Sequence, residues 1–158
     1  MFELEQANHN RTGPDAVDGK GRLYELKSTT RDRVSSARDV GLDHLRKWRQ
    51  LNWIFGRGNY EGRAFKFEEI YLLTPAQMEP WFEIIEEKIT EDDALFARIL
   101  RVLKKEGFTV AERERVQRAF RRGVLLNDPK IRWTYVQTHG VRIERNHAKE
   151  LRELLSRN

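Results

Sequence analysis

The sequence predicts an α/β domain in which short strands are combined with amphipathic helices. Apolar and polar residues alternate within residues 24–27 and 131–135, which is typical of strands. Apolar residues recur at helical spacing in residues 41–50 and over much of residues 75–122. With 158 residues, the chain has the length of one domain with a sizeable core.

The first third of the chain is expected to contain a β-hairpin between two helices. Residues 2–6 predict a short helix. The runs Asp15–Val17 and Leu23–Ser28 flank a Gly-Lys-Gly turn, which predicts the hairpin. Residues 29–40 are polar and predict a loop. The next helix is expected over Gly41–Gln50, because four apolar residues fall at helical spacing: Leu42, Leu45, Trp48 and Leu51.

The middle of the chain is expected to begin with two strands. The first starts at residues 53–55 and enters a glycine-rich turn at residues 56–62, and the second returns to end at Leu73. Thr74 and Pro75 then have the residue types of a helix N-cap and first helical position.

Two further helices are expected after the one that begins at Pro75. The first of them would begin at Asp92 or Asp93 and end at Gly107. The other would begin after Thr109 and end at Gly123.

The C-terminal part is expected to contain a strand pair and a helix. Residues 131–135 predict a strand, and residues 141–143 are expected to pair with it across a turn at His139–Gly140. Residues 146–156 predict a final helix. All four tryptophans fall at apolar positions of these elements and are expected in the core: Trp48, Trp53, Trp81 and Trp133.

The first hairpin carries the candidate chemistry. On a strand, residues two apart project from the same face, so Glu25 and Lys27 point together. Tyr24 and Leu26 then point into the core. Asp15 lies near the open end of the hairpin, within reach of Glu25. Two carboxylates can hold Mg²⁺ on a phosphate, and a neighbouring lysine can orient or deprotonate an attacking water. These are the parts of a metal-dependent phosphodiesterase, although an ordinary hairpin with charged residues on its solvent face shows the same spacing.

Charge is distributed unevenly along the chain. It carries 30 basic and 25 acidic residues, a formal net charge of +5. Acidic residues concentrate in residues 79–93, and basic residues concentrate in residues 98–122. Such stripes occur on solvated helix faces, and the basic one would equally suit a surface that faces nucleic-acid phosphates.

The composition also excludes several classes of protein. The chain has no cysteine, which excludes disulfides and thiolate metal sites. It has no apolar run of about 18 residues, so no membrane span is expected. The N-terminus lacks a basic region followed by an apolar stretch, so it does not have the pattern of a secretion signal. We therefore expect a cytoplasmic protein.

Several stretches of the chain carry a family resemblance. They are Gly13–Asp18 with Tyr24–Ser28, Lys47–Phe55, Glu69–Pro75, and Asn127–Ile131 followed by Tyr135–Val136 and His139–Gly140. Together they resemble the PD-(D/E)XK nucleases and, more narrowly, the PvuII family of type II restriction endonucleases. The resemblance implies one nuclease domain over residues 1–158, with a restriction-endonuclease-like core in which helices flank a central mixed sheet. Relative to that family, the chain is expected to lack most of the N-terminal subunit-pairing helices. It gains a helical insertion at about residues 80–125 and a C-terminal helix.

The resemblance also implies an activity. It points to a Mg²⁺-dependent type II restriction endonuclease that hydrolyses phosphodiester bonds of double-stranded DNA at a short palindromic site. Asp15 and Glu25 would hold the metal, and Lys27 would complete the catalytic set. The enzyme is expected to be a homodimer with a companion DNA methyltransferase encoded nearby. Two alternatives stay open: a structure-specific or repair nuclease of the same superfamily, and a DNA-binding module that does not cut.

Two segments are expected to contact DNA. The first contains Arg31, Arg33, Ser35, Ser36, Arg38 and Asp39, and the second contains Asn127, Asp128 and Lys130. The histidines with which the family contacts its central bases have no counterpart near Ala37–Asp39. Asp128 stands where the family has a second asparagine. An aspartate only accepts hydrogen bonds, which suits a cytosine amino group, so a different recognition sequence is expected.

Overall fold

The computed structural model describes residues 4–7, 13–38, 40–123 and 128–143. Within these residues, six strands form a central sheet in the order β1-β2-β3-β5-β6-β8. Neighbouring strands are antiparallel except β3 and β5, which are parallel, so the sheet is mixed. The strands are β1 Leu4–Gln6, β2 Ala16–Asp18, β3 Leu23–Thr29, β5 Asn52–Glu61, β6 Ala64–Leu73 and β8 Val141–Arg142.

A separate two-stranded ribbon joins segments that lie far apart in the sequence. Its strands are β4 Arg33–Ser35 and β7 Lys130–Arg132, which run antiparallel with Ser35 opposite Lys130. The ribbon buries Val34 against Ile131, and both side chains are at most 1% exposed. The expectation of a loop throughout residues 29–40 is therefore wrong for β4. A strand with one apolar residue has no visible pattern until its distant partner is known.

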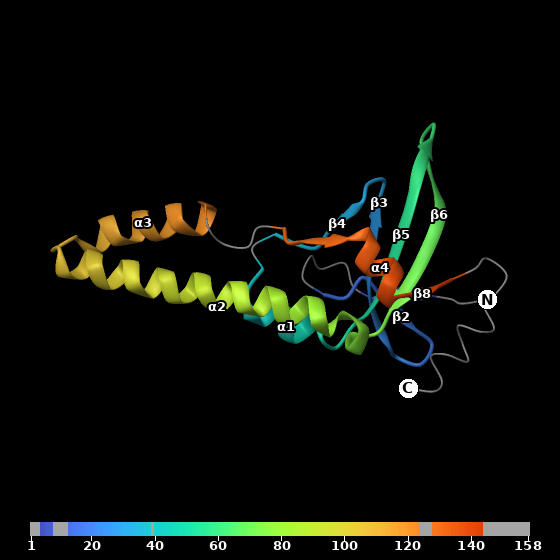
Figure 1. Cartoon of the computed structure of the whole chain (residues 1–158), viewed down its shortest axis with the longest axis horizontal. Coiled ribbons are helices and arrows are strands. Elements are labelled where there is room, and N and C mark those ends of the chain that lie inside the picture. Colours follow the sequence, from blue (N-terminus) through green and yellow to red (C-terminus); the bar gives the residue numbers. More distant parts are fainter. Residues whose placement is uncertain (1–3, 8–12, 39, 124–127, 144–158) are drawn as a thin grey trace.

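Four helices accompany the strands in the described part of the chain. They are α1 Leu42–Trp48, α2 Pro75–Lys105, α3 Val110–Gly123 and α4 Trp133–His139. The expected combination of a mixed sheet with flanking helices is confirmed (Figure 1). None of these helices combines the length and apolar character that a membrane span requires.

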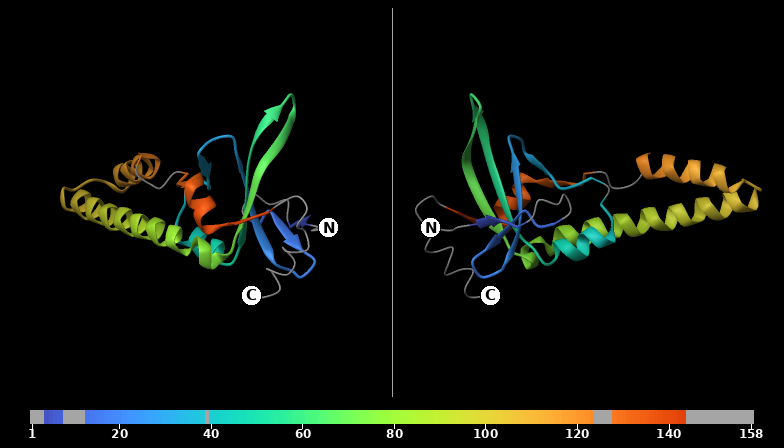
Figure 2. Two further views of the ribbon diagram at one scale, coloured as in Figure 1. Left: turned by 45° about the vertical axis from the view of Figure 1, so that its right-hand side comes forward. Right: turned by 180° about the vertical axis from the view of Figure 1, so that it is seen from behind.

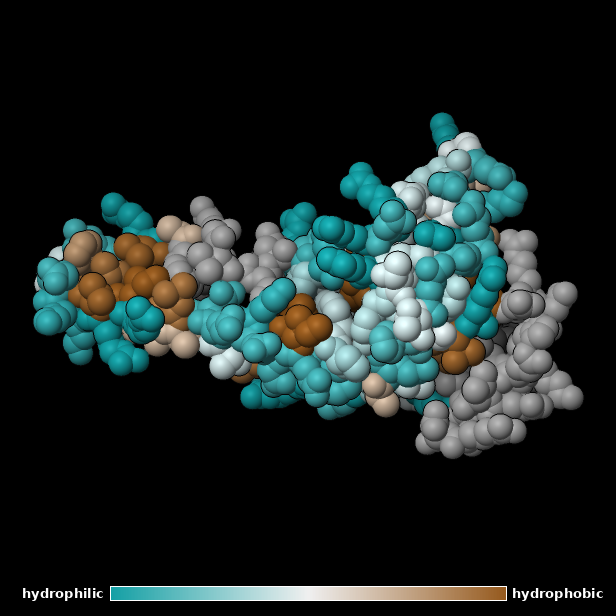
Figure 3. Space-filling view, viewed as in Figure 1, coloured by the Kyte–Doolittle hydropathy of each residue, from teal (hydrophilic) through white to brown (hydrophobic). Residues whose placement is uncertain are grey.

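Figures 1 and 2 show two parts that project from this sheet. The β5–β6 hairpin extends beyond the other strands, and α2 continues far past the sheet with α3 folded back along its distal half. Hydrophobic side chains gather at the far end of these two helices on the face seen in Figure 3.

The helix start and stop signals that the sequence offers are largely confirmed. The backbone N–H of Gln77 donates to Thr74 Oγ1 and the N–H of Thr74 donates to Gln77 Oε1, so Thr74 caps α2 with Pro75 in its first turn. Thr109 caps α3 in the same way through Glu112. Gly107 ends the turn after α2 with φ +77°.

Two expected boundaries near these signals are wrong. No new helix begins at Asp92 or Asp93, because α2 runs without interruption from Pro75 to Lys105. Acidic residues resemble N-caps in sequence, but here neither glycine nor proline breaks the helix at that point. Residues 4–6 form β1 rather than a helix, because Glu5 pairs with Val17 at the edge of the sheet.

The C-terminal strand pair is also corrected. After β7 the chain turns into α4, so the strand expected over residues 131–135 ends at Arg132. Trp133 and Val136 are both buried, and a spacing of three residues suits a helix. Residues 141–142 pair with β6 instead of β7. The helix expected at residues 146–156 lies outside the described residues.

Aromatic side chains form the main core between the sheet and the helices. The four tryptophans are at most 6% exposed, as expected. The rings of Trp48 on α1 and Trp53 on β5 lie 5.3 Å apart, and that of Phe82 on α2 lies 6.1 Å from Trp53. These contacts fix α1 and α2 against one face of the sheet. Tyr24 is buried as expected, but Leu26 is 40% exposed, because β2 pairs with β3 only as far as Tyr24.

Two of the three glycines expected to form a turn at residues 56–62 lie inside β5 instead. Gly56 and Gly58 are buried in the strand, and the turn comes later, at Gly62 with φ +63°. A Cβ atom built at Gly58 would lie 1.9 Å from the Lys66 carbonyl oxygen on β6. The glycine therefore permits the close approach of two backbones at an irregularity in the strand pairing.

Asp18 closes the β2–β3 hairpin. Its Oδ1 accepts from the backbone N–H groups of Lys20 and Arg22, and its Oδ2 accepts from Arg22 Nε at 2.7 Å and Tyr24 Oη at 3.0 Å. Burial alone would raise the pKa of Asp18, but the bonds from Arg22, Lys20 and Tyr24 outweigh burial and hold the pKa at about 2. The ionised carboxylate thus links both strands and the turn.

Replacing Gly58 by alanine should lower the free energy of unfolding by about 1–3 kcal/mol, because the added methyl group meets backbone that cannot rotate away. Urea unfolding followed by circular dichroism measures this difference. Gly19→Ala is the control, since no atom lies within 4 Å of a Cβ built there. Equal effects of the two substitutions would contradict the close-packing role of Gly58.

Asp18→Asn should cost about 2 kcal/mol of stability at pH 7, from a pKa lowered from 3.8 to about 2. Because the folded-state pKa is depressed, the carboxylate stabilises the protein above pH 4, and this stabilisation is lost as the pH falls toward 2. The difference in the free energy of unfolding between parent and variant, measured by urea unfolding, should therefore decrease from pH 4 to pH 2. Asp43→Asn, at an exposed carboxylate on α1, is the control, and its free energy of unfolding should vary with pH as that of the parent does.

Candidate active site

The hairpin brings Asp15 across to β3. Asp15 directly precedes β2, and its backbone N–H donates to the Tyr24 carbonyl oxygen at 2.9 Å. Its carboxylate Oδ2 accepts from the backbone N–H of Leu26 at 2.8 Å. The Asp15 carboxylate therefore lies over the β3 backbone beside Glu25, and its solvent side remains exposed.

Glu25 and Lys27 form an ion pair on one face of β3, as the spacing of two predicts. Lys27 Nζ lies 2.5 Å from Glu25 Oε1. In the parallel pairing of β3 with β5, Glu25 lies opposite Trp53 and Lys27 lies opposite Phe55. Both aromatic residues belong to the core, so the charged pair stands at the edge of a buried face, and Glu25 is only 8% exposed.

The electrostatics of the pair favour an additional positive charge. Burial raises the pKa of the Glu25 carboxyl, the Lys27 ammonium partly offsets this, and the Asp15 carboxylate raises the pKa again. Two carboxylates thus share a small volume with one lysine. A cation bound between Asp15 and Glu25 would reduce their mutual repulsion.

These donors fit Mg²⁺. Among the described residues, no group of three or more histidine, aspartate, glutamate or cysteine side chains could hold a metal ion by itself. Mg²⁺ is commonly bound by one or two carboxylates, with water and substrate phosphate supplying the other oxygens. Asp15 and Glu25 provide that minimum, and nitrogen or sulfur ligands for zinc are absent from this cluster.

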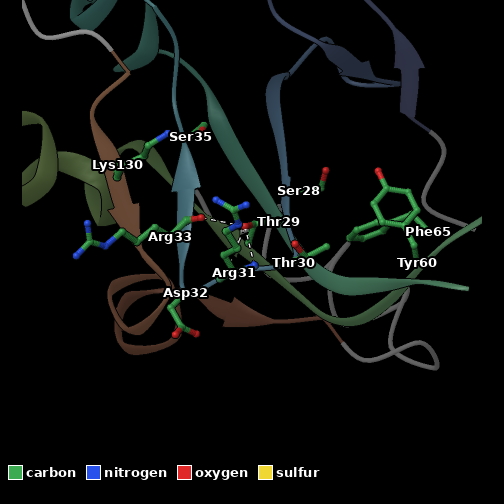
Figure 4. A pocket seen from close by; sticks show the side chains of 10 residues that line it. All are labelled: Ser28, Thr29, Thr30, Arg31, Asp32, Arg33, Ser35, Tyr60, Phe65 and Lys130. Atoms are coloured by element: carbon green, nitrogen blue, oxygen red, sulfur yellow. Dashed lines mark hydrogen bonds between the residues drawn. The ribbon is translucent and has the colours of Figure 1, made fainter.

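A groove begins at the end of β3, at the residue after Lys27. Its volume is about 680 Å³, and its lining residues are Ser28, Thr29, Thr30, Arg31, Asp32, Arg33, Ser35, Tyr60, Phe65 and Lys130. Figure 4 shows the ribbon residues on one side of it and the two aromatic residues on the other. Thr29 Oγ1 shapes the turn, because it accepts from the Arg31 N–H at 3.0 Å and donates to the Arg33 carbonyl oxygen at 2.9 Å.

The structure brings together four of the residues expected to contact DNA. Arg31, Arg33, Ser35 and Lys130 all line the groove, although they come from segments about a hundred residues apart. The β4–β7 ribbon produces this meeting, and Lys130 Nζ donates to Ser35 Oγ at 2.6 Å.

The other expected DNA contacts are placed differently. Ser36 is buried, and its hydroxyl donates to the Pro129 carbonyl oxygen at 2.7 Å, so it fastens the ribbon rather than facing the groove. Arg38 is exposed outside the groove lining. Asp128 is partly buried beside the groove and forms an ion pair with Lys130. Burial would raise the pKa of Asp128, but its bond with Lys130 holds the pKa below the ordinary value. Asp39 and Asn127 lie outside the described residues.

Sequence reasoning did not single out the aromatic side of the groove. Tyr60 is 69% exposed near the tip of the β5–β6 hairpin, and its ring packs edge-on against Phe65 at 5.2 Å. The two residues flank the Gly62 turn, which is the one signal in the sequence that could have placed them side by side. Asp18 was missed as well, since its role depends on bonds that only the folded hairpin shows.

Comparison with known proteins adds to this geometry. A family model described as restriction endonuclease PvuII matches residues 1–99. The match spans the strands from β1 to β6 and most of α2, and it includes Asp15, Glu25, Lys27 and the groove residues up to Phe65. The ribbon strand β7, helix α3 and helix α4 follow the matched region. Since well over half of the chain is matched, the protein belongs to the PvuII family of restriction endonucleases and is a nuclease.

Proposed function

We propose that this protein is a Mg²⁺-dependent type II restriction endonuclease that cuts double-stranded DNA at a short palindromic site. The observation that carries the proposal is the convergence of Asp15, Glu25 and Lys27 at β3, whose next residue, Ser28, lines a basic groove, in a chain of a restriction endonuclease family. Glu25 is buried at a net energetic cost, which a purely structural hairpin would not require.

Each residue of the cluster has a distinct role in the proposed reaction. Asp15 and Glu25 hold the ion, and a bound Mg²⁺ would neutralise charge on the scissile phosphate and lower the pKa of water. Lys27, positioned by Glu25, orients the attacking water and offers its charge to the phosphate oxygens. Asp18 acts on this arrangement indirectly, because it holds the hairpin that sets the distance between Asp15 and Glu25.

The groove would contact the duplex in two ways. Arg31 and Arg33 are exposed and suit DNA phosphates. Lys130, Ser35 and Asp128 present donors and acceptors together at the ribbon end and suit base edges in the major groove. We propose the ribbon as the part that determines the recognition sequence. The same proposal extends to Asn127, Asp39 and Arg38, which border these segments.

A second candidate is a structure-specific nuclease of the same superfamily. The exposed Tyr60–Phe65 pair favours it, because aromatic rings stack on bases that have left the double helix. A non-cleaving DNA-binding module has less support, since it would not need two carboxylates close to DNA phosphates. Incubation of plasmid DNA with the protein and Mg²⁺ distinguishes the three functions. Discrete fragments indicate a restriction endonuclease, a smear indicates a nuclease without a fixed site, and unchanged DNA indicates a binding module.

Cutting both strands requires two catalytic sets, and the described residues of one chain contain a single set. We therefore propose a homodimer whose two-fold symmetry matches the two halves of a palindromic site. A restriction endonuclease acting in the cytoplasm would also require protection of the host DNA. A companion DNA methyltransferase encoded nearby would supply it.

Asp15→Asn, Glu25→Gln and Lys27→Met should each slow plasmid cleavage by at least about a hundredfold, because each removes a group that acts in the transition state. DNA binding, measured by fluorescence anisotropy in Ca²⁺, should remain close to that of the parent. Glu61→Gln, at an exposed carboxylate near the hairpin tip, is the matched control and should cut normally. Normal cleavage by any of the three site variants would refute the assigned roles.

Asp128→Asn should shift the preference at one base pair by about 1–3 kcal/mol, because the amide adds a donor beside the remaining acceptor. Arg31→Ala should instead weaken binding to all sequences alike and reduce the salt dependence by about one phosphate contact. Selection of bound sites from randomised DNA distinguishes these effects. An unchanged site preference for Asp128→Asn would show that Asp128 serves only to hold Lys130.

A further inference from the structure

The distal half of α2 and the whole of α3 form an arm that projects away from the sheet (Figures 1 and 2). This arm falls within the region expected as a helical insertion. Three large apolar residues of α2 are exposed along it: Ile84 at 51%, Leu95 at 41% and Val102 at 57%. At 3.6 residues per turn they lie within about 20° of one another around the helix. They therefore lie along one line of the helix, which we call the apolar strip, and Lys88 and Glu91 lie between Ile84 and Leu95.

Helix α3 does not cover the apolar strip. Phe96, Leu100 and Leu103 lie on a different side of α2 and are partly buried, whereas Leu95 and Val102 remain open. Phe108 and Val110, at the tip of the arm, are 41% and 62% exposed. Figure 3 shows the resulting hydrophobic patch at the far end of the molecule. A contiguous apolar patch of this kind marks a surface that is covered by a partner.

The charges beside the apolar strip indicate that the partner covering it is a second copy of this chain. Glu87 and Glu91 lie on one flank of it, and Arg98 and Lys105 lie farther along the same flank. At 3.6 residues per turn the four residues fall within about 40° of one another, and all are exposed. When two copies of such a helix pack antiparallel, each flank faces the same flank of its partner. The acidic half of one copy then lies against the basic half of the other.

The same antiparallel arrangement also accommodates the tip of the arm. With the two-fold axis near Leu95, the charges oppose one another, and the partner's Phe108 lies level with Ile84. A recess of about 620 Å³ opens there between α2 and α4, with Trp81, Ile84, Tyr135 and His139 in its lining. An exposed phenylalanine at the tip thus meets a partly apolar recess on the other copy.

We propose that the apolar strip of α2 is the surface through which two copies of this chain pair, with their arms antiparallel and Phe108 of each copy in the recess beside Ile84 of the other. The inference rests on the surface of the arm and not on the proposed chemistry. The paired copy would supply the second catalytic set that a double-strand cut requires.

Light scattering on the full chain without DNA tests the pairing. The parent should be a dimer. Leu95→Glu should raise its dissociation constant by at least a hundredfold, because residue 95 lies at the two-fold axis and the two new carboxylates face each other. Val102→Glu should raise it less, because residue 102 lies level with Lys88 of the other copy. Ala97→Glu adds the same charge on the opposite, exposed side of α2 and should remain dimeric. A monomeric parent, or equal dissociation by all three variants, would overturn the proposal.

Single cysteines then test the orientation, since the natural chain has none. Leu95→Cys should form a covalent dimer with a short bismaleimide. Ile84→Cys should cross-link to Phe108→Cys when the two variants are mixed, and neither should cross-link efficiently alone. Cross-linking of Ile84→Cys to itself would indicate parallel arms and contradict the antiparallel arrangement. A dimer that cuts no DNA would refute the proposed function and leave this pairing intact. A monomer that cuts DNA would refute the pairing and leave the proposed nuclease activity intact.

Discussion

The candidate site depends on the short β2–β3 hairpin, and the hairpin depends on one ionised carboxylate. Asp18 accepts bonds from the turn backbone, from Arg22 and from Tyr24, so it joins both strands where they are closest. With the hairpin closed, the bond from the Asp15 N–H to the Tyr24 carbonyl oxygen fixes the other end. Asp15 and Glu25 are then held together despite their like charges.

A second constraint is the meeting of distant segments in the β4–β7 ribbon. Burial of Val34 and Ile131 and the bond from Ser36 to Pro129 hold the two strands together. Trp133 adds a bond from its indole N–H to Glu69 and packs under the guanidinium of Arg57. The polar residues of the ribbon are thereby fixed relative to the sheet that carries the carboxylates, which gives the groove a rigid wall.

Local features could be predicted from the sequence, and features that depend on distant partners could not. The hairpin, the Thr74 cap and the pairing of Glu25 with Lys27 follow from neighbouring residues, and the structure contains all three. Strand β4 could not be predicted from the sequence, because its partner strand lies about a hundred residues away. Gly58 resembles a turn residue until β6 is placed against it. Leu26 has the pattern of a core residue but projects past the end of β2.

The central claim is that Asp15 and Glu25 form a divalent metal site beside bound DNA. Mn²⁺ binding followed by electron paramagnetic resonance tests it most directly, with DNA present and with Mg²⁺ as competitor. The account predicts that the parent binds Mn²⁺, that Mg²⁺ displaces it, and that Asp15→Asn abolishes binding while the variant still holds DNA. Equal Mn²⁺ binding by the parent and Asp15→Asn, or no binding by the parent on DNA, would contradict it.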